Sequence, residues 1–168
     1  LLSELKPYKP TIVRGNASEI IALASLWELL DTEDALDRPR GVDTTDGVDA
    51  AREAAVTLAR YTGGAVVVSG EVDLVTDGAT VVRSHGGSEL MSKITGCGCS
   101  QGGVLAVYAT CADAFTAAVA GTSHYNLAGT RAAAVANAPA SFKVAFIDEL
   151  YRATGEEIAA NPMCVEEA

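Results

Sequence analysis

Hydrophobic positions in the first part of the chain follow the period of a strand, then of a helix, then of a strand again. The segment PTIVRG, residues 10–15, is a short β-branched run bounded by proline and glycine, which predicts a strand. Residues 16–30 place apolar side chains at helical spacing, and residues 44–64 repeat that spacing up to two glycines. The apolar run AVVVSG, residues 65–70, is typical of a strand covered on both faces. This order predicts a βαβ crossover in a parallel sheet.

Polar residues mark where the first of these helices begins. Asn16 is placed to cap it, and Glu19, three residues on, completes a capping box. In such a box each side chain accepts a hydrogen bond from the other residue's backbone amide. The apolar residues at helical spacing are Ile20, Leu23, Leu26 and Trp27. The charged segment that follows, residues 31–41, predicts an exposed loop.

A hairpin is predicted directly after the second strand. Residues 71–87, EVDLVTDGATVVRSHGG, alternate apolar and polar positions on both sides of the dipeptide Asp77-Gly78. Such a dipeptide between alternating runs predicts a hairpin with a type I′ turn.

The remainder of the chain, from Ser100 onward, has helical spacing almost throughout. It predicts one helix to about Ala120, a second through 125–136, and a third over 141–154 that ends at Gly155. The whole pattern predicts an α/β fold: a parallel sheet flanked by helices, with a β-hairpin and a helical C-terminal half.

Length, composition and charge narrow the class of protein. A chain of 168 residues is expected to form one domain and to bury about 70% of its unfolded surface. Hydrophobic residues make up 49% of it and aromatic residues only 5%, which favours close-packed helices over an aromatic-rich β-sandwich. The net charge of −10, without a lysine or arginine block, argues against nucleic acid as a partner. An anionic ligand would therefore be held by local geometry.

The stretch TGCGCSQGG, residues 95–103, joins four glycines and two cysteines directly before an apolar helical segment. A helix start carries free N–H groups and a partial positive charge, and glycines let the backbone approach an anion closely. The stretch therefore indicates a cradle for an oxyanion or phosphate; a tight turn whose glycines serve packing explains the same residues. Cys99 lies where the helix field favours a thiolate, so it could act as a base, a nucleophile or an oriented polar contact.

Other uses of the cysteines stay open at this point. Cys97 and Cys99 could be small buried thiols, a redox pair, or two ligands of a zinc ion. The only other residues that could complete a zinc site are Cys111, Cys164, His85 and His124. The spacing does not resemble a secreted disulfide framework, and the N-terminus LLSELKPYKP does not resemble a signal peptide. We therefore expect a cytoplasmic protein, and no apolar run is long enough to cross a membrane.

Five motifs in order extend over nearly all of the chain. They are RGNASEI (14–20), GVDTTD (41–46), SGEVDLVTDG (69–78), LMSKITGCGCS (90–100) and SFKVAFIDELYRATGE (141–156). Together they resemble the hydroxyethylthiazole kinase family. The resemblance implies a ribokinase-like α/β fold, a homotrimer, and Mg²⁺-dependent transfer of the γ-phosphate of ATP to the hydroxyl of 4-methyl-5-(2-hydroxyethyl)thiazole, in thiamine biosynthesis and salvage.

The same resemblance assigns roles to individual residues. Arg14 and Ser69 match nucleotide-contacting positions, and Asn16 and Gly98 are assigned to the nucleotide as well. Arginine suits this role because its guanidinium can grip phosphate oxygens.

The chemical step and its surroundings are assigned in the same way. Gly96 matches the glycine at the thiazole site, and Glu19 matches the glutamate associated with the Mg²⁺ site. Cys99 matches the catalytic cysteine, at a position where related ribokinase-like kinases usually have aspartate. Phosphoryl transfer has a loose transition state, so a modest base close to the hydroxyl can suffice.

Members of this family have a large N-terminal portion that supplies much of the thiazole pocket. We therefore expect residues 1–168 to be the C-terminal part of a single ribokinase-like domain, and a longer product or a lost front part to exist. Two other functions stay open: another ribokinase-like vitamin-precursor kinase or nucleotide-dependent dehydratase, and a truncated remnant that binds nucleotide without turnover.

Overall fold

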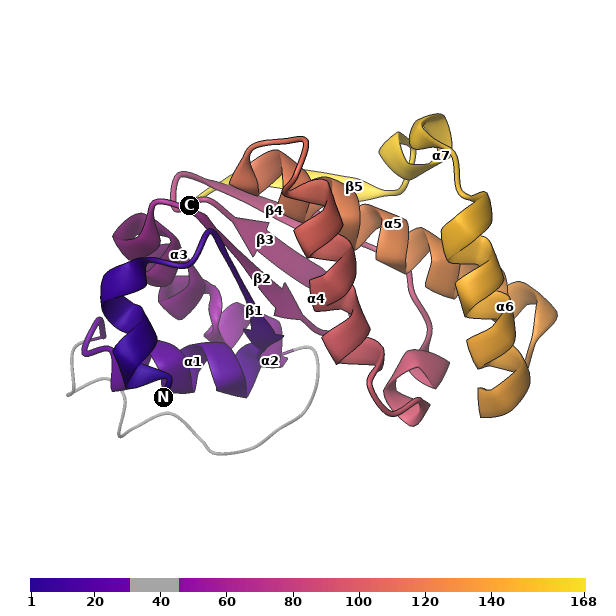
Figure 1. The fold of residues 1–168 in the computed structure, drawn as a ribbon, viewed down its shortest axis with the longest axis horizontal. Helices are drawn as coiled ribbons and strands as arrows, with labels where there is room; N and C mark the ends of the chain where they lie inside the picture. The colour runs from indigo at the N-terminus through magenta and orange to yellow at the C-terminus, as the bar shows by residue number, and fades with distance from the viewer. Residues whose placement is uncertain (31–45) are drawn as a thin grey trace. The chain divides into compact units, whose positions relative to one another are not determined.

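The computed structural model describes residues 1–30 and 46–168 and has an α/β architecture (Figure 1). Its contacts divide the chain into two compact units. They are Leu1–Arg83 with Val165–Ala168, which holds most of the sheet, and Ser84–Cys164, which is mainly helical. The loop predicted over 31–41 lies outside the described residues, as does nearly all of the motif 41–46.

The first unit begins with the predicted βαβ arrangement. In chain order its elements are a 3-10 helix η1 (Ser3–Tyr8), β1 (Ile12–Asn16), α1 (Ala17–Leu26), α2 (Asp46–Ala50), α3 (Arg52–Thr62) and β2 (Ala65–Ser69). β1 and β2 pair in parallel, with Ile12 opposite Ala65 and Asn16 opposite Ser69. The carboxyl ends of the two strands therefore lie side by side.

Helix boundaries in this unit follow their caps more closely than the hydrophobic pattern. α1 starts at the predicted capping box but ends at Leu26, four residues earlier than predicted. The helix predicted over 44–64 is divided at Ala51 into α2 and α3. α3 ends at Gly63, as predicted, because glycine adopts the left-handed φ of 70° at low cost.

The sheet continues with β3 (Asp73–Thr76), which is antiparallel to β2, and with β4 (Thr80–Ser84). β3 and β4 form the predicted hairpin, but the predicted type I′ turn is wrong. That turn requires a positive φ at both central residues, and of the pair only Gly78 has one, of 93°. Instead the Asp77 carboxylate accepts hydrogen bonds from the amides two and three residues on, at 2.9 and 2.7 Å. The aspartate side chain thus shapes a three-residue loop.

A fifth strand, β5 (Met163–Glu167), completes the order β1-β2-β3-β4-β5, and the sequence pattern does not predict it. Arg83 Nε donates to the Glu166 carboxylate at 2.8 Å, and the guanidinium of Arg52 donates to the carbonyl of Glu167 at 2.6 Å. The strand is largely exposed, so polar contacts supply much of what holds it.

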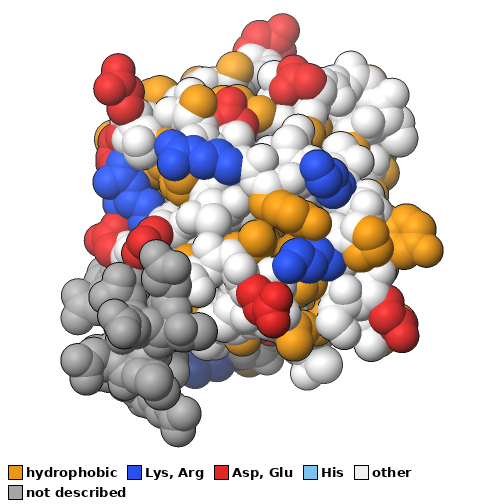
Figure 2. Space-filling model, turned by 90° about the vertical axis from the view of Figure 1, so that its left-hand side faces the viewer, with side chains coloured by type: hydrophobic (Ala, Val, Ile, Leu, Met, Phe, Trp, Pro, Cys, Tyr) orange, Lys and Arg blue, Asp and Glu red, His pale blue; other side chains and the backbone are white. Residues whose placement is uncertain are grey.

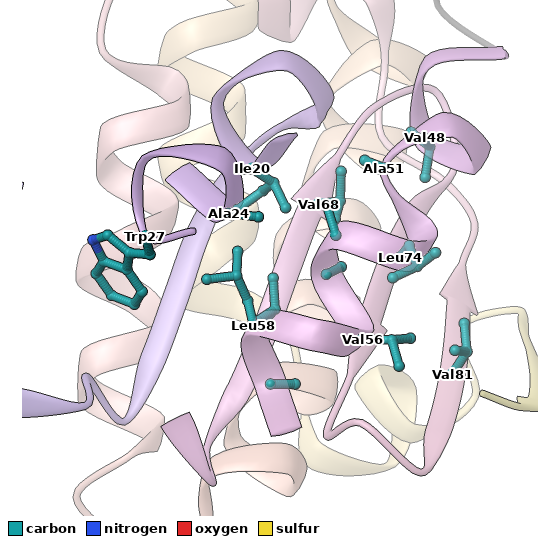
Figure 3. Close-up of a cluster of buried hydrophobic side chains, with 14 residues drawn as sticks. Ile20, Ala24, Trp27, Val48, Ala51, Val56, Leu58, Val68, Leu74 and Val81 are labelled. Atoms are coloured by element: carbon teal, nitrogen blue, oxygen red, sulfur yellow. The ribbon is translucent and has the colours of Figure 1, made fainter. Parts of the chain in front are cut away.

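The core of the first unit lies between its strands and the helices α1 and α3 (Figure 3). Its fully buried side chains include Ile20, Ala24, Leu58, Val66, Val68, Leu74 and Val81. All four residues Ala65–Val68 are completely buried, which confirms the strand predicted from the apolar run. Leu26, which shares the helical spacing of Ile20, is 51% exposed because α1 ends there.

The second unit is built from helices, which confirms the predicted helical C-terminal half. Its elements are a 3-10 helix η2 (Glu89–Lys93), α4 (Cys97–Tyr108), α5 (Ala114–Val135), α6 (Pro139–Arg152) and α7 (Gly155–Ala159). The predicted division near Ala120 is wrong. The break falls between Tyr108 and Ala114, and the Asp113 side chain caps the single 22-residue helix α5 by accepting from the amide of Thr116 at 3.0 Å.

Glycines inside α5 allow close packing and do not interrupt the helix. A Cβ on Gly121 would lie 2.8 Å from a methyl carbon of Leu105 in α4. A Cβ on Gly129 would lie 2.7 Å from the sulfur of Met91. Gly155 likewise opens α7 instead of ending the preceding helix, because Thr154 forms a capping box there.

Candidate functional site

Two predicted nucleotide-binding residues meet at the carboxyl ends of β1 and β2. Arg14 Nη2 donates to Ser69 Oγ at 2.8 Å across the two strands. Because side chains alternate along a strand, Arg14 and Asn16 share the face of β1 opposite to Val13, which packs against the core. Ligands of α/β sheets bind beyond the carboxyl ends of parallel strands. The pair therefore lies where a phosphate contact is expected.

The start of α1 follows β1 without a loop, and the predicted capping box is confirmed. Asn16 Oδ1 accepts from the amide of Glu19 at 2.9 Å, and Glu19 Oε2 accepts from the amide of Asn16 at 2.7 Å. Gly15 permits this tight junction, since a Cβ there would lie 3.0 Å from the Cβ of Glu19. Asn16 and Glu19 are thereby held at the same strand end as Arg14.

The carboxylate of Glu19, to which the motif assigns a magnesium role, is only partly used by the cap. Oε2 is engaged in the cap, while Oε1 has no hydrogen-bond partner in the described part of the chain. Mg²⁺ is usually held by one or two carboxylates together with substrate phosphates and water. Glu19 is exposed and offers one carboxylate oxygen outside the cap, and the capping box orients its side chain.

The glycine-rich stretch forms the first turn of α4, which begins three residues earlier than predicted. Gly96 is the N-cap with a φ of 83°, and the helix starts at Cys97 instead of Ser100. Gly98 and Cys99 therefore occupy the second and third helical positions, whose amides have no intrahelical acceptor. Cys97 is 8% exposed, whereas Cys99 is exposed to solvent. The chain thus buries one thiol of the pair and presents the other.

A tyrosine that the sequence does not single out lies against this turn. The hydroxyl of Tyr125, from α5, donates to the carbonyl of Cys97 and lies 2.7 Å from Ser100 Oγ. Tyr125 is 2% exposed, and its ring meets the ring of Phe146 edge-on at 4.8 Å between centroids. A tyrosine within a helical pattern is ordinarily a core residue, so no sequence signal distinguishes it.

The structure thus groups the predicted site residues in two sets, one in each unit. The first unit holds Arg14, Asn16, Glu19 and Ser69, and the second holds Gly96, Gly98 and Cys99. All four cysteines are free thiols. Among the described residues, no three histidine, cysteine or carboxylate side chains gather as metal ligands would. An open cavity of about 360 Å³ in the second unit, near Thr130 and Asn161, is lined by none of the predicted site residues.

Surface charge on the face shown in Figure 2 is mixed. Lysine and arginine side chains stand apart there, among acidic and hydrophobic ones, and do not form one continuous basic patch. This agrees with an anion held by a few placed groups. Within residues 1–30 and 46–168, no helix combines the length and the hydropathy that crossing a membrane requires.

Comparison with known proteins identifies relatives over almost the whole sequence. The model of the hydroxyethylthiazole kinase family matches residues 1–156. A hydroxyethylthiazole kinase of Bifidobacterium animalis subsp. lactis is 47% identical over 97% of this chain and 57% of its own length. One from Clavibacter sepedonicus is 49% identical over 95% of this chain and 55% of its own length.

A solved structure gives the same result for the fold. The hydroxyethylthiazole kinase protein of Pyrococcus horikoshii OT3 superposes with a TM-score of 0.73 at 26% identity. The match covers 94% of this chain and 54% of that protein. The ribokinase-like α/β fold implied by the motifs is therefore confirmed, and the chain spans a little over half the length of these relatives.

Proposed function

Because the chain belongs to the hydroxyethylthiazole kinase family, we propose that it serves the ATP-dependent phosphorylation of 4-methyl-5-(2-hydroxyethyl)thiazole in thiamine biosynthesis and salvage. The observation that carries the proposal is the family match over residues 1–156, which includes every predicted site residue. The acceptor is the hydroxyl of the thiazole alcohol, and the donor is the γ-phosphate of ATP.

Nucleotide binding is assigned to four of the predicted residues. Arg14 and Ser69 offer a guanidinium and a hydroxyl already joined by a 2.8 Å hydrogen bond, and Asn16 adds an amide side chain at the same strand end. Gly98 contributes a backbone amide at the start of α4, where the helix field favours a phosphate.

Cys99 is assigned the catalytic role, with Gly96 next to the thiazole. Phosphoryl transfer requires little proton abstraction before the new bond forms, so positioning and charge neutralisation do most of the work. As a thiolate, the exposed side chain of Cys99 would orient the alcohol and take its proton as the P–O bond forms, becoming a thiol. The amides of the first turn of α4 would stabilise the charge on the moving phosphoryl group.

Magnesium is assigned to Glu19, whose Oε1 remains available beside the cap. When bound with ATP, Mg²⁺ would neutralise the phosphate oxygens. We further propose that residues 1–168 are the C-terminal part of a single domain, that the protein is cytoplasmic, and that it assembles as a homotrimer. Small molecules are the proposed ligands, with neither nucleic acid nor membrane as a partner.

A competing function is a remnant that binds nucleotide without turnover, which would require only the nucleotide contacts assigned above. A different ribokinase-like kinase or dehydratase is less well supported, because those enzymes usually have aspartate where Cys99 stands.

Two assays separate these functions. Transfer of labelled phosphate from ATP to the thiazole alcohol is measured with the 168-residue chain alone, and with the chain mixed with the part of the Bifidobacterium animalis relative that it does not match. ATP binding is measured by calorimetry in parallel. Transfer in either sample supports the kinase, and ATP binding without transfer in both supports the remnant. Absence of both transfer and binding would contradict each of them.

A further inference from the structure

The hydroxyl of Tyr125 contacts the first turn of α4 before and after Gly98 and Cys99, to which site roles are assigned. It donates to the carbonyl of Cys97 and lies 2.7 Å from Ser100 Oγ, while the sulfur of Cys97 is 3.4 Å away. Ser100 Oγ also lies 2.9 Å from that same carbonyl. One of these two hydroxyl groups can therefore donate to the carbonyl, while the other donates to the oxygen of its hydroxyl neighbour. Gly98 and Cys99 lie between the two contacted residues in the sequence.

Cys97 is the buried side chain of this turn, and the glycines around it add no side-chain packing. A Cβ placed on Gly96, Gly102 or Gly103 would meet nothing within 4 Å. Cys99 is exposed, and the N-cap has no side chain that could accept from the free amides. A turn of this composition is expected to fray unless a neighbouring element fixes it.

Tyr125 is well suited to fix it. The residue is in the interior of the 22-residue helix α5 and is 2% exposed. Its ring packs edge-on against Phe146 at an interplanar angle of 80°, and Phe142 stacks on Phe146. The hydroxyl therefore has a defined position relative to the body of the second unit.

We propose that Tyr125 is a positioning residue for phosphoryl transfer, acting through Ser100 and the carbonyl of Cys97 to hold the first turn of α4. The inference rests on the proposed kinase function and adds a residue that its motifs do not contain. Tyr125 holds the thiol of Cys99 and the amide of Gly98 in one arrangement, and it touches neither substrate. A misplacement of about 1 Å in a reacting group can cost about a hundredfold in rate.

The test compares Tyr125→Phe with Tyr108→Phe. The first variant keeps the packed ring and removes the hydroxyl from the turn. The second removes a hydroxyl that joins the same two helices at the other end of α4, where Tyr108 lies 3.0 Å from His124 Nδ1. Both are measured in the preparation in which the wild-type chain transfers phosphate. We expect Tyr125→Phe to lower kcat by about tenfold to a hundredfold while each KM changes less than about twofold. Tyr108→Phe is expected to keep kcat within about twofold.

Amide hydrogen exchange of peptides covering residues 94–104 gives a second readout that does not need activity. Exchange in this turn should accelerate by about tenfold in Tyr125→Phe, with peptides from α5 and α6 unchanged. Ser100→Ala should have a smaller effect in the Tyr125→Phe background than in the wild type, because both hydroxyls belong to one network.

The outcomes separate this inference from the function on which it rests. A wild-type chain that transfers no phosphate under any condition contradicts the proposed function, and exchange then decides whether Tyr125 holds the turn. An active wild type with unchanged kcat and unchanged exchange in Tyr125→Phe overturns the positioning role. Equal losses in Tyr125→Phe and Tyr108→Phe overturn it as well, since they would reflect general packing between α4 and α5.

Discussion

Cys99 occupies the third position of α4 with its thiol exposed, while Cys97, two residues earlier, is buried. If Cys99, as a thiolate, orients the alcohol and accepts its proton, removal of the sulfur should slow the chemical step and leave binding nearly intact. We expect Cys99→Ala to lower kcat about a hundredfold, within the usual range for loss of a proton-transfer group, with the KM for the thiazole within about threefold. Steady-state kinetics measures both.

Cys111→Ala is the matched control, since it removes another exposed thiol close to the end of the same helix. It should leave kcat unchanged. A Cys99→Ala variant with normal kcat and a raised KM would assign the sulfur to binding.

Glu19 has two separable duties, and variants can distinguish them. Glu19→Gln keeps an oxygen that can accept from the amide of Asn16 but loses the charge. We therefore expect a free energy of unfolding within about 0.5 kcal/mol of the wild type, since the cap bond can be retained. The Mg²⁺ concentration for half-maximal activity should rise about tenfold, because ligand charge supports Mg²⁺ binding. Urea denaturation and a magnesium titration measure these quantities.

Asn16→Ala provides the opposite comparison for stability. It removes the acceptor for the amide of Glu19 and should lower the free energy of unfolding by about 1 kcal/mol. If Glu19→Gln destabilised the protein as much and left the magnesium dependence unchanged, Glu19 would serve the helix cap alone.

At the scale of elements, the start of α7 makes stability depend on pH. Glu157 pairs with Arg131 of α5 at 2.6 Å and accepts from the amide of Thr154, and these contacts lower the pKa of Glu157 from 4.5 to about 2. A carboxylate with a depressed folded-state pKa contributes stability that is complete above about pH 4.5 and is lost as the pH falls towards 2. The urea midpoint of the wild type should therefore fall more steeply over this window than that of Glu157→Gln.

Glu156→Gln is the matched control for this measurement, because it removes the neighbouring carboxylate of the same helix. It should keep the steep dependence of the wild type. Equal slopes for Glu157→Gln and the wild type would contradict a stabilising Arg131–Glu157 pair.

Most elements of this fold could be predicted from local sequence, and the errors share a physical cause. The strands at β1 and β2 and the capping box of Asn16 are read from the chain because local residues determine them. The extent of α5 could not be read in the same way, because Gly121 and Gly129 suggest weak helix and their purpose is contact with other elements. The strand β5 was not predicted for the same reason, because the arginines that bind it are distant in sequence.

The candidate site could likewise be predicted only where local sequence determines it. Glycines directly before a helical segment indicate an anion cradle or a tight turn over residues 95–103, while the roles of Arg14 and Ser69 came from family motifs. Their 2.8 Å hydrogen bond joins residues 55 positions apart and follows from strand pairing. Tyr125 could not be identified at all, because its hydroxyl matters only through a packing arrangement between two helices.

At the scale of the whole molecule, the net charge opposes any association between copies of the chain. Each chain carries a net charge of −10, so copies that assemble repel one another, and salt screens that repulsion beyond about 10 Å at 0.1 M ionic strength. If the protein forms the proposed homotrimer, sedimentation should show a species with three times the 17.2 kDa mass of the chain, and its share should grow between 50 and 500 mM salt. An assembly held mainly by ion pairs would respond in the opposite direction. A monomer at every salt and protein concentration would contradict the trimer while leaving ATP binding by the chain an independent question.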